Sequence, residues 1–401
     1  MVINMGNSHK SKNVRLLLPV CCLLLLTGCW SRIEVNDRAF VTGMYIDRLD
    51  NGDYEVSLGF PLANRLATGG HSNTTDGGGG GGNPFALVSK KAENIPVAIR
   101  KIRSDLTREI SWGHCRIVIV GRKMAESGIG AVLEFISREP TFHIKSYIMV
   151  APGQGKSISE LTPVFERMPA EVLREFAKRR VTIDTSIKDF LESAASGGDM
   201  VTALLTIGQE KMVSEKGKMS TWVGTDGAAV FKKDKMVGTF DVKDMRAVLW
   251  VKGKMKSSLI SLKSPTDGKI ISFLILNSKT VIKPVKDQGK IRFDIKIEAE
   301  DDIVSSESNI DLTEPEEILR IEEMLSKQLT GRVNHVIKKS QKMGADIFGF
   351  GQYIDWNFPK IWDTYKDRWP SEYKNVKFNV EAKILVRRTG VEKNPIMQKH
   401  Q

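Results

Sequence analysis

The spacing of apolar residues divides the first part of the chain into short strands and helices. Residues 38–47 and 54–62 are predicted to form two strands, because the sequence Asp50-Asn51-Gly52-Asp53 between them is typical of a tight hairpin turn. Two continuous apolar stretches, 115–120 and 147–150, enclose a predicted helix at 131–138. This order of strand, helix and strand favours a right-handed βαβ unit with a parallel pair of strands.

Helix signals accompany these strands. Asn94 is expected to cap a helix that has Pro96 in its first turn, and further helices are expected at 170–179 and 186–194. Beyond Gly197-Gly198 the pattern changes. It predicts a hairpin around 228–238, a helix near 242–249 and a strand at 270–276.

The last third of the chain has the clearest periodicity. Thr313 and Glu316 form a capping-box pattern before a long helix that is expected to end near Gly344. The alternation at 376–386, together with apolar segments near 281 and at 291–297, predicts a sheet on which this helix packs. The apolar stripe of the helix consists of Ile318, Ile321, Leu325, Leu329, Val333, Val336 and Ser340.

These elements predict an α+β protein with three mixed domains in tandem after a lipoprotein signal peptide. The six consecutive glycines at 77–82 predict a flexible loop, since such a segment buries too little apolar surface to be ordered. The last domain is expected to be a sheet packed on one long helix. The predicted divisions are a signal peptide at 1–28, an N-terminal domain at 29–200 with a Gly-rich loop at 68–83, a small middle domain at 201–276, a C-terminal domain at 277–391 with a long helix at 313–343, and a tail at 392–401.

The N-terminus has the pattern of an export signal. Residues 1–15 carry three basic residues and no acidic ones, and the apolar stretch 16–26 is shorter than the roughly 20 residues that a membrane span needs. The sequence Leu26-Thr27-Gly28-Cys29 follows directly and resembles a bacterial lipobox. That resemblance implies a diacylglyceryl group on Cys29, and two acyl chains suffice to hold a protein on the outer face of a membrane. The alternative is an ordinary secretory signal with an accidental cysteine.

Composition restricts the function further. The net charge is +12, and the densest basic region is 211–256. This region could lie against anionic headgroups, but a solvated lysine face is the favoured interpretation. The export signal and the absence of a nucleic-acid-binding motif exclude nucleic acid as the expected partner. Of the four cysteines, only Cys115 remains after the signal and the anchor are set aside, so no disulfide is expected within the mature chain.

Candidate chemistry is sparse. The sequence Gly153-Gln154-Gly155-Lys156-Ser157 resembles the end of a phosphate-binding loop, but Val150 stands where the first glycine should be, which favours a turn with an exposed lysine. His114 and Cys115 have no partners at metal-binding spacing, and Cys115 starts an apolar strand, so a buried and unreactive thiol is expected. Asp301 and Asp302 are adjacent and should point to opposite sides of a strand. We therefore predict no catalytic residues, no cofactor and no metal site.

Aromatic residues are dense between Phe348 and Trp369. They predict either a small apolar core or an exposed surface for a partner, and the core is the favoured interpretation.

Several motifs, in order along the chain, resemble the Ger(x)C, or GerAC-like, family of spore germination lipoproteins. The resemblance implies three α+β domains and a non-enzymatic, lipid-anchored C subunit of a nutrient germinant receptor. Such a subunit would lie on the spore inner membrane and work with membrane-embedded A and B subunits. The motifs are Leu26-Thr27-Gly28-Cys29-Trp30 with Arg32 and Glu34; Ala39-Phe40-Val41 through Ile46-Asp47; Gly113-His114; Arg138-Glu139-Pro140; and Gly344-Ala345-Asp346-Ile347-Phe348-Gly349-Phe350-Gly351.

Two other functions stay open. A solute-binding lipoprotein of an uptake system would need a ligand cleft, usually between two similar lobes, and the sequence shows no repeated halves. A hydrolase acting on the spore cortex would need catalytic residues that the sequence lacks. The nutrient, the residues that contact partners, and whether this chain binds a small molecule are not specified by the sequence.

Overall fold

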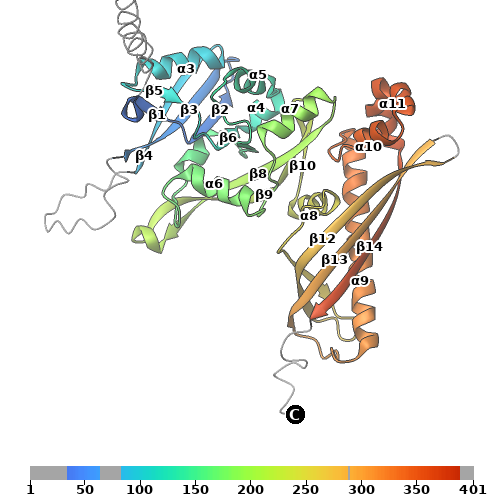
Figure 1. Cartoon of the computed structure of the whole chain (residues 1–401). Coiled ribbons are helices and arrows are strands. Elements are labelled where there is room, and N and C mark those ends of the chain that lie inside the picture. Colours follow the sequence, from blue (N-terminus) through green and yellow to red (C-terminus); the bar gives the residue numbers. More distant parts are fainter. Residues whose placement is uncertain (1–33, 64–82, 288–289, 389–401) are drawn as a thin grey trace, which may run out of the picture.

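The computed structural model describes residues 34–63, 83–287 and 290–388. Two larger sheets organise this part of the chain (Figure 1), one of eight strands in the order β10-β9-β8-β7-β6-β2-β3-β4 and one of four in the order β11-β12-β13-β14. We call the part around the first sheet, residues 34–240, the N-terminal unit, and the part from 241 onward the C-terminal unit. The mixed α/β architecture predicted from the sequence is confirmed.

The N-terminal unit begins with the predicted hairpin. Strands β2 (Gly43–Arg48) and β3 (Tyr54–Pro61) pair in antiparallel fashion, and β4 (Phe85–Ala92) continues the sheet beside β3. The expectation of one strand over 38–47 is wrong at its start. Residues Arg38–Phe40 form a separate strand, β1, which pairs with β5 (Glu109–Ser111), because the backbone N–H groups of Val41 and Thr42 turn to different partners, Ser111 and Gly59.

The predicted parallel pair is also present. Strand β6 (Ile117–Val120) runs parallel to both β2 and β7 (Tyr147–Val150), and α4 (Arg122–Ser127) and α5 (Gly130–Arg138) connect β6 to β7. Every residue of β6 is buried, which explains its continuous apolar sequence.

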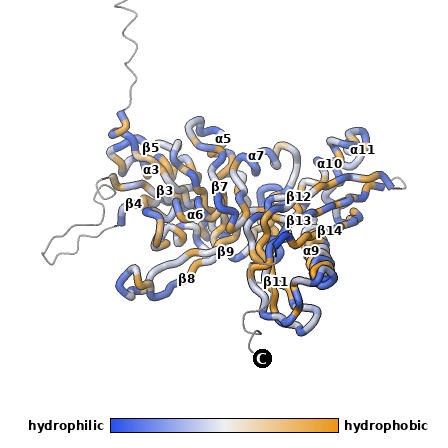
Figure 2. The backbone as a smooth tube through the Cα atoms, turned by 60° about the horizontal axis from the view of Figure 1, so that its bottom comes forward, coloured by the Kyte–Doolittle hydropathy of each residue, from blue (hydrophilic) through white to orange (hydrophobic). Residues whose placement is uncertain are grey.

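Helices cover both faces of this sheet. On one face, α3 (Ile95–Ser104), α4, α5 and α7 (Ile187–Ala195) share a core with the strands, and on the other face α6 (Pro169–Lys178) does so. The cap predicted for α3 is confirmed, since the side-chain oxygen of Asn94 accepts a hydrogen bond of 2.9 Å from the N–H of Val97. Figure 2 shows the apolar segments gathered where strands and helices meet.

The segment expected to be a small middle domain is divided between the two sheets. Its strands β8 (Met200–Met212), β9 (Lys218–Lys232) and β10 (Lys235–Phe240) extend the first sheet, and β8 pairs with β7 of the preceding segment. The predicted boundary at 200/201 therefore falls inside a strand. Gly197-Gly198 ends helix α7 and its turn, but it does not end a domain.

The second predicted boundary, at 276/277, falls inside β12 (Ile270–Asp287). The apolar run stops there because the ladder between β12 and β13 (Lys290–Ser306) has an irregularity at 275–277, beyond which β12 is more exposed. Strands β11 (Leu259–Lys263) and β14 (Lys377–Arg388) complete the second sheet, with β14 parallel to β13. The predicted loop at 68–83, apart from residue 83, and the predicted tail at 392–401 lie outside the described residues.

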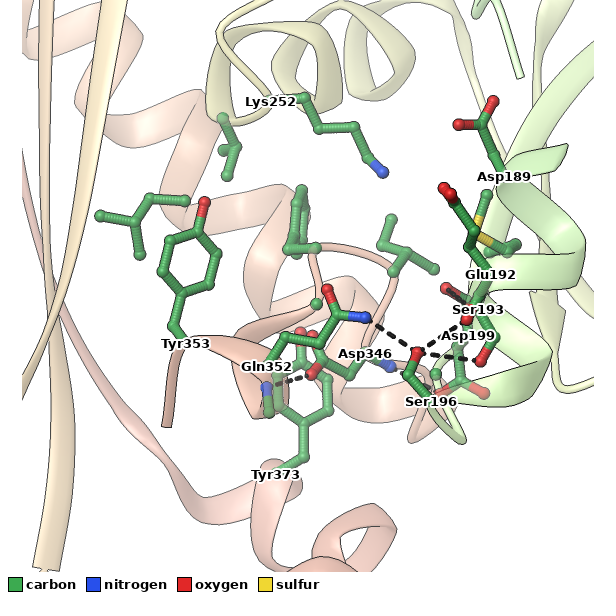
Figure 3. A pocket seen from close by; sticks show the side chains of 18 of the residues that line it. Asp189, Glu192, Ser193, Ser196, Asp199, Lys252, Asp346, Gln352, Tyr353 and Tyr373 are labelled. Atoms are coloured by element: carbon green, nitrogen blue, oxygen red, sulfur yellow. Dashed lines mark hydrogen bonds between the residues drawn. The ribbon is translucent and has the colours of Figure 1, made fainter. Parts of the chain in front are cut away.

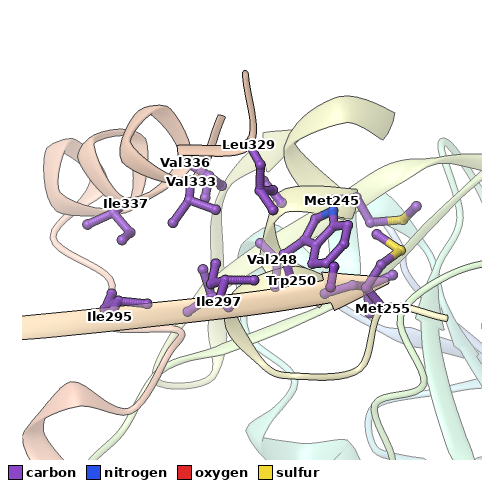
Figure 4. Packing of buried hydrophobic residues seen from close by; sticks show 14 of the residues in the cluster. Met245, Val248, Trp250, Met255, Ile295, Ile297, Leu329, Val333, Val336 and Ile337 are labelled. Atoms are coloured by element: carbon purple, nitrogen blue, oxygen red, sulfur yellow. The ribbon is translucent and has the colours of Figure 1, made fainter. Parts of the chain in front are cut away.

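The long helix α9 (Pro315–Met343) packs on this sheet, as the sequence predicts. Figure 4 shows Val333, Val336 and Ile337 of α9 facing Ile295 and Ile297 of β13. The same core includes apolar residues of α8 (Val242–Val251), and it continues to Val201, Ala228 and Val230 of the first sheet. Helix α8 thus joins the two units through apolar contacts.

The capping box predicted for α9 is wrong. The helix follows Glu314, which makes no side-chain capping hydrogen bond, and the hydroxyl of Thr313 donates instead to the carboxylate of Asp311 at 2.7 Å. The Pro315 ring sets the first helical residue, and Gly344 ends the helix in the left-handed region with φ of 64°.

The aromatic segment after α9 folds into short helices that are mostly core, in agreement with the favoured prediction. Phe350, Trp369 and Tyr373 are buried, whereas Trp356 is 70% exposed. The helices are α10 (Phe350–Asn357), α11 (Pro359–Tyr365) and α12 (Trp369–Glu372).

Asp301 is an unusual core residue. It is fully buried in β13, and neither of its carboxylate oxygens has a hydrogen-bond partner among the described residues. Burial, with a smaller effect of the neighbouring Asp302, raises the pKa of Asp301 to about 7. The ionised form of Asp301 therefore destabilises the fold, because nothing replaces the water that it loses.

This burial predicts a pH dependence of stability. The folded-state pKa lies above the value of about 4 in the unfolded chain, so the folded state binds the proton more tightly, and stability should fall as the pH rises from about 4 to about 7. Asp301→Asn should flatten this slope and raise the free energy of unfolding at pH about 8 by something on the order of 2–4 kcal/mol. Urea unfolding at several pH values measures both effects.

Glu298→Gln is the matched control, because Glu298 is exposed on the same strand. It should leave the slope unchanged. Parallel stability curves for Asp301→Asn and the unaltered protein would contradict the assignment of the slope to Asp301.

Candidate functional site: the junction between the two units

The predicted lipid anchor, Cys29, lies outside the described residues, so its modification stays a prediction. Within the described ranges, no helix has both the length and the apolar character required to cross a bilayer.

Cys115 is the buried thiol that the sequence predicts. It is fully buried and its Sγ lies 3.5 Å from the carbonyl oxygen of Ile117. Burial raises the pKa of the thiol to about 12, so the reactive thiolate does not form near neutral pH. His114 packs edge-on against Phe40, and in the part of the chain that the structure describes no three His, Cys, Asp or Glu residues are grouped for a metal ion.

The glycine-rich loop at 153–157 binds a carboxylate of the protein itself. The backbone N–H groups of Gly155 and Lys156 donate to the two carboxylate oxygens of Asp47, at 2.7 and 3.0 Å. Lys156 is half-buried rather than exposed, because its amine lies 2.9 Å from Glu55. The Asp47 carboxylate thus occupies the place that a bound phosphate would take in a phosphate-binding loop. This place lies at the end of the parallel strands, where ligands usually bind in such sheets.

Gly121 makes this arrangement possible. A Cβ atom there would overlap the Asp47 carboxylate and lie 3.0 Å from the backbone nitrogen of Gly155. Burial raises the pKa of Asp47, and the two donated hydrogen bonds oppose that shift. The loop is therefore a structural clamp between β2 and the segment after β7.

A second buried carboxylate, Asp346, organises the junction of the two units. Its Oδ1 accepts from the N–H of Phe350 at 3.0 Å, and its Oδ2 accepts from the N–H of Gly351 and from the indole of Trp369, both at 2.9 Å. The carboxylate of Asp346 thus accepts hydrogen bonds from the first two N–H groups of α10, which have no partner within the helix. Burial raises its pKa, whereas these donors lower it.

Glycines around Asp346 permit this geometry. Gly344 and Gly349 have φ of 64° and 72°, values that disfavour other residues. A Cβ on Gly351 would lie 2.7 Å from Trp362 and 3.0 Å from Trp369. The glycines of the sequence motif at 344–351 thus serve one purpose, which is to wrap the backbone around a buried carboxylate.

Asp199 of the N-terminal unit continues the network. Its carboxylate accepts from the N–H of Asp346 at 2.8 Å and from the N–H of Lys233 at 2.9 Å. The side chain of Gln352 donates to the hydroxyl of Ser196 at 2.8 Å. Beyond these, Lys254 pairs with Asp184 at 2.7 Å. Polar contacts therefore link the units beside the apolar contacts of α8.

A cavity of about 400 Å³ lies within this junction. One wall comes from α7 and residues 196–199, and the other from the end of α8 and residues 344–353. Figure 3 shows the amine of Lys252 extending into the cavity toward Asp189 and Glu192, with Tyr353 on the other side. We call this space the junction cavity.

Lys252 is the notable charge in the junction cavity. Burial lowers its pKa to about 8, with a further contribution from Lys254, while the carboxylates of Asp189, Asp346 and Asp184 oppose the shift. The lining of the cavity combines these charged groups with apolar and aromatic side chains, which is typical of a small-molecule binding site.

Sequence reasoning did not identify this site. Asp199, Lys252 and Asp346 are far apart in the chain and meet only in the fold. One feature of the sequence could have indicated this site. Asp346 has glycines on both sides in the motif at 344–351, which indicates a constrained backbone but does not indicate which residues lie around it.

Comparison with known proteins agrees with this architecture. Residues 31–207 match a family model described as the spore germination protein N-terminal domain, and residues 226–390 match one described as spore germination B3/GerAC like, C-terminal. The crystal structure of the GerBC protein shares the fold, with a TM-score of 0.55 and 19% identity over 86% of this chain and 96% of that one.

Two curated proteins of Bacillus subtilis (strain 168) extend the similarity along nearly the whole chain. The putative spore germination protein YfkR is 28% identical over 94% of this chain and 96% of its own length. Spore germination protein KC is 26% identical over 96% of this chain and 97% of its own length.

By its fold and its junction, the chain is an α+β protein in which two units meet at a buried polar contact. The two family models match in the expected order and together span most of the chain. The chain belongs to the GerAC-like family of spore germination proteins, and the resemblance seen in the sequence is confirmed.

The junction predicts a specific sensitivity. Asp346→Asn should lower the free energy of unfolding by about 2–4 kcal/mol, because an amide nitrogen would face backbone and indole N–H donors that now point at a carboxylate. Asp355→Asn, an exposed change on the same helix α10, should stay within about 0.5 kcal/mol of the unaltered protein. Urea unfolding followed by tryptophan fluorescence measures both, and equal effects of the two changes would refute the role of Asp346.

Proposed function

We propose that this chain is the non-enzymatic, lipid-anchored C subunit of a spore nutrient germinant receptor, which works with membrane-embedded A and B subunits. The observation that carries the proposal is the match of both halves of the chain to spore germination family models. Relatives named as spore germination proteins B3 and A3 cover at least 90% of this chain.

The absence of an evident catalytic centre supports a binding or assembly role. The described histidines and Cys115 are not arranged for nucleophilic or metal chemistry, and the carboxylates of Asp199 and Asp346 at the junction accept backbone hydrogen bonds. The hydrolase interpretation receives no support from these side chains.

The position of Cys29 supports a close attachment to the membrane. Only four residues separate Cys29 from Glu34, the first residue that the structure describes. A segment this short spans at most roughly 18 Å when fully extended. A lipid on Cys29 would therefore hold the N-terminal unit directly at the membrane surface, and would confine its search for partners to the membrane plane.

The alternative, a solute-binding lipoprotein of an uptake system, gains support from the junction cavity but not from the architecture. Its two walls come from units of different size and topology, an eight-stranded and a four-stranded sheet, rather than from similar lobes. Affinity isolation of the tagged chain from spore membranes separates the two functions. Germinant-receptor A and B subunits should come with it, and recovery of transporter components alone would establish the alternative.

The anchor leads to a direct prediction. Cys29→Ala should move the protein from the spore membrane fraction to the soluble fraction and reduce nutrient germination, because the chain would lose its two acyl chains. Cys22→Ala removes a cysteine from the same predicted signal and should change neither result. Membrane sedimentation with quantitative blotting, together with germination assays, provides the measurements.

A Cys29→Ala protein that is present at normal level, still sediments with spore membranes and supports full germination would refute the anchoring part of the proposal.

A further inference from the structure

The two walls of the junction cavity carry opposite charges. On the wall formed by α7, Asp189 and Glu192 face the cavity, and on the opposite wall Lys252 does so (Figure 3). The charges belong to different units, since α7 is part of the N-terminal unit and Lys252 follows α8. They do not neutralise each other through an ion pair across the space.

The acidic wall has unused hydrogen-bonding capacity. Asp189 uses its Oδ2 to accept from the N–H and the hydroxyl of Ser186, both at 2.7 Å. Glu192 uses its Oε1 to meet Lys188 at 2.6 Å. The second oxygen of each carboxylate has no partner among the described residues. Glu192 is 60% exposed in its side chain, so it stands where solvent enters.

Lys252 is also unused. Its amine forms no hydrogen bond or ion pair with any described residue, although the neighbouring Lys254 is paired with Asp184. Burial disfavours a lone ammonium group, as the lowered pKa of Lys252 indicates. A lysine that enters a cavity without a partner costs stability, and a bound anionic group would remove that cost.

Apolar side chains complete the cavity. Ile183, Leu249, Phe348 and Tyr353 contribute to its lining together with the polar residues. The volume of about 400 Å³ is within the range of small-molecule sites and is too small for a folded partner.

We infer that the junction cavity binds a small zwitterion, a free amino acid with an apolar side chain. Its carboxylate pairs with Lys252, its ammonium group lies against Glu192 and Asp189, and its side chain packs on the apolar lining. This inference goes beyond the proposed function and does not rest on it, because binding is tested on this chain alone.

The charge arrangement selects this class over simpler ligands. A plain carboxylate would meet Lys252 but would also lie beside two carboxylates, and a plain amine would gain those carboxylates but would leave Lys252 unpaired. An ion with both charges satisfies both walls at once. Because the walls belong to different units, the bound amino acid bridges them next to the contact between Gln352 and Ser196.

The experiment compares three matched compounds by isothermal titration calorimetry on the full chain in detergent. They are L-leucine, its decarboxylated amine 3-methylbutylamine and its deaminated acid 4-methylpentanoate, with L-alanine and L-phenylalanine added to vary the side chain. At least one of the three amino acids should bind. For leucine, removal of either charge should weaken binding roughly tenfold to a hundredfold, as is typical for hydrogen bonds to charged groups.

Variants assign each charge to its residue. Lys252→Gln should weaken amino-acid binding by a similar factor and should remove the advantage of the amino acid over the amine. Glu192→Gln should reduce the advantage of the amino acid over the acid, with Asp189 still present. Glu192 is chosen over Asp189 because Asp189 also forms the capping box of α7. Lys243→Gln, an exposed change on α8 with the same loss of charge, should have no effect.

The inference is overturned if none of the three amino acids binds, or if Lys252→Gln binds them as tightly as the unaltered protein. Circular dichroism melting of each variant shows whether it is folded, so that a loss of binding by a misfolded variant is not counted as support. Failure of this inference leaves the receptor assignment unaffected, because that assignment is tested by partner isolation.

Discussion

Burial of the Asp346 carboxylate is the constraint on which the junction depends. A buried carboxylate must be fully hydrogen-bonded, and the donors that serve Asp346 come from the start of α10 and from Trp369. Those donors fix the path of the chain after α9, while the backbone of Asp346 is held by Asp199 of the other unit. The side chain of Asp346 therefore fixes the start of α10 and the packing of Trp369, while its backbone N–H makes a polar contact between the units.

A buried carboxylate bound by backbone N–H groups occurs twice in the molecule. Glycine-rich backbone surrounds Asp47 in the N-terminal unit and Asp346 at the junction, and in both places a Cβ on a nearby glycine would collide with the structure. The loop at 153–157 resembles a phosphate-binding loop in sequence, since backbone N–H groups bind a carboxylate and a phosphate in the same manner. The difference is that the anion here belongs to the protein. A glycine-rich sequence alone cannot distinguish an internal anion from an external one.

Local patterns in the sequence predicted the local elements. The spacing of apolar residues reflects which faces of an element are buried. Helix α9 and strand β14 have apolar residues on one face, whereas the parallel strands β6 and β7 are apolar on both faces. The two failed boundaries have a nonlocal cause. Whether β8 joins the preceding sheet depends on its pairing with β7, and no residue of β8 encodes its partner. The junction cavity was missed for the same reason, since its charges converge from segments that are remote in sequence.

The way in which the units are joined limits what the junction can do. Helix α8 contributes Met245, Val248 and Trp250 to a core that extends from α9 to Val201 and Val230 of the first sheet. Close-packed apolar cores resist gradual deformation, so the two units cannot hinge freely about α8. The polar side of the junction differs, because hydrogen bonds such as the one from Gln352 to Ser196 can exchange with water at little net cost. A change that passes between the units is therefore expected at exposed contacts such as that between Gln352 and Ser196, while Asp346 and the apolar core stay fixed.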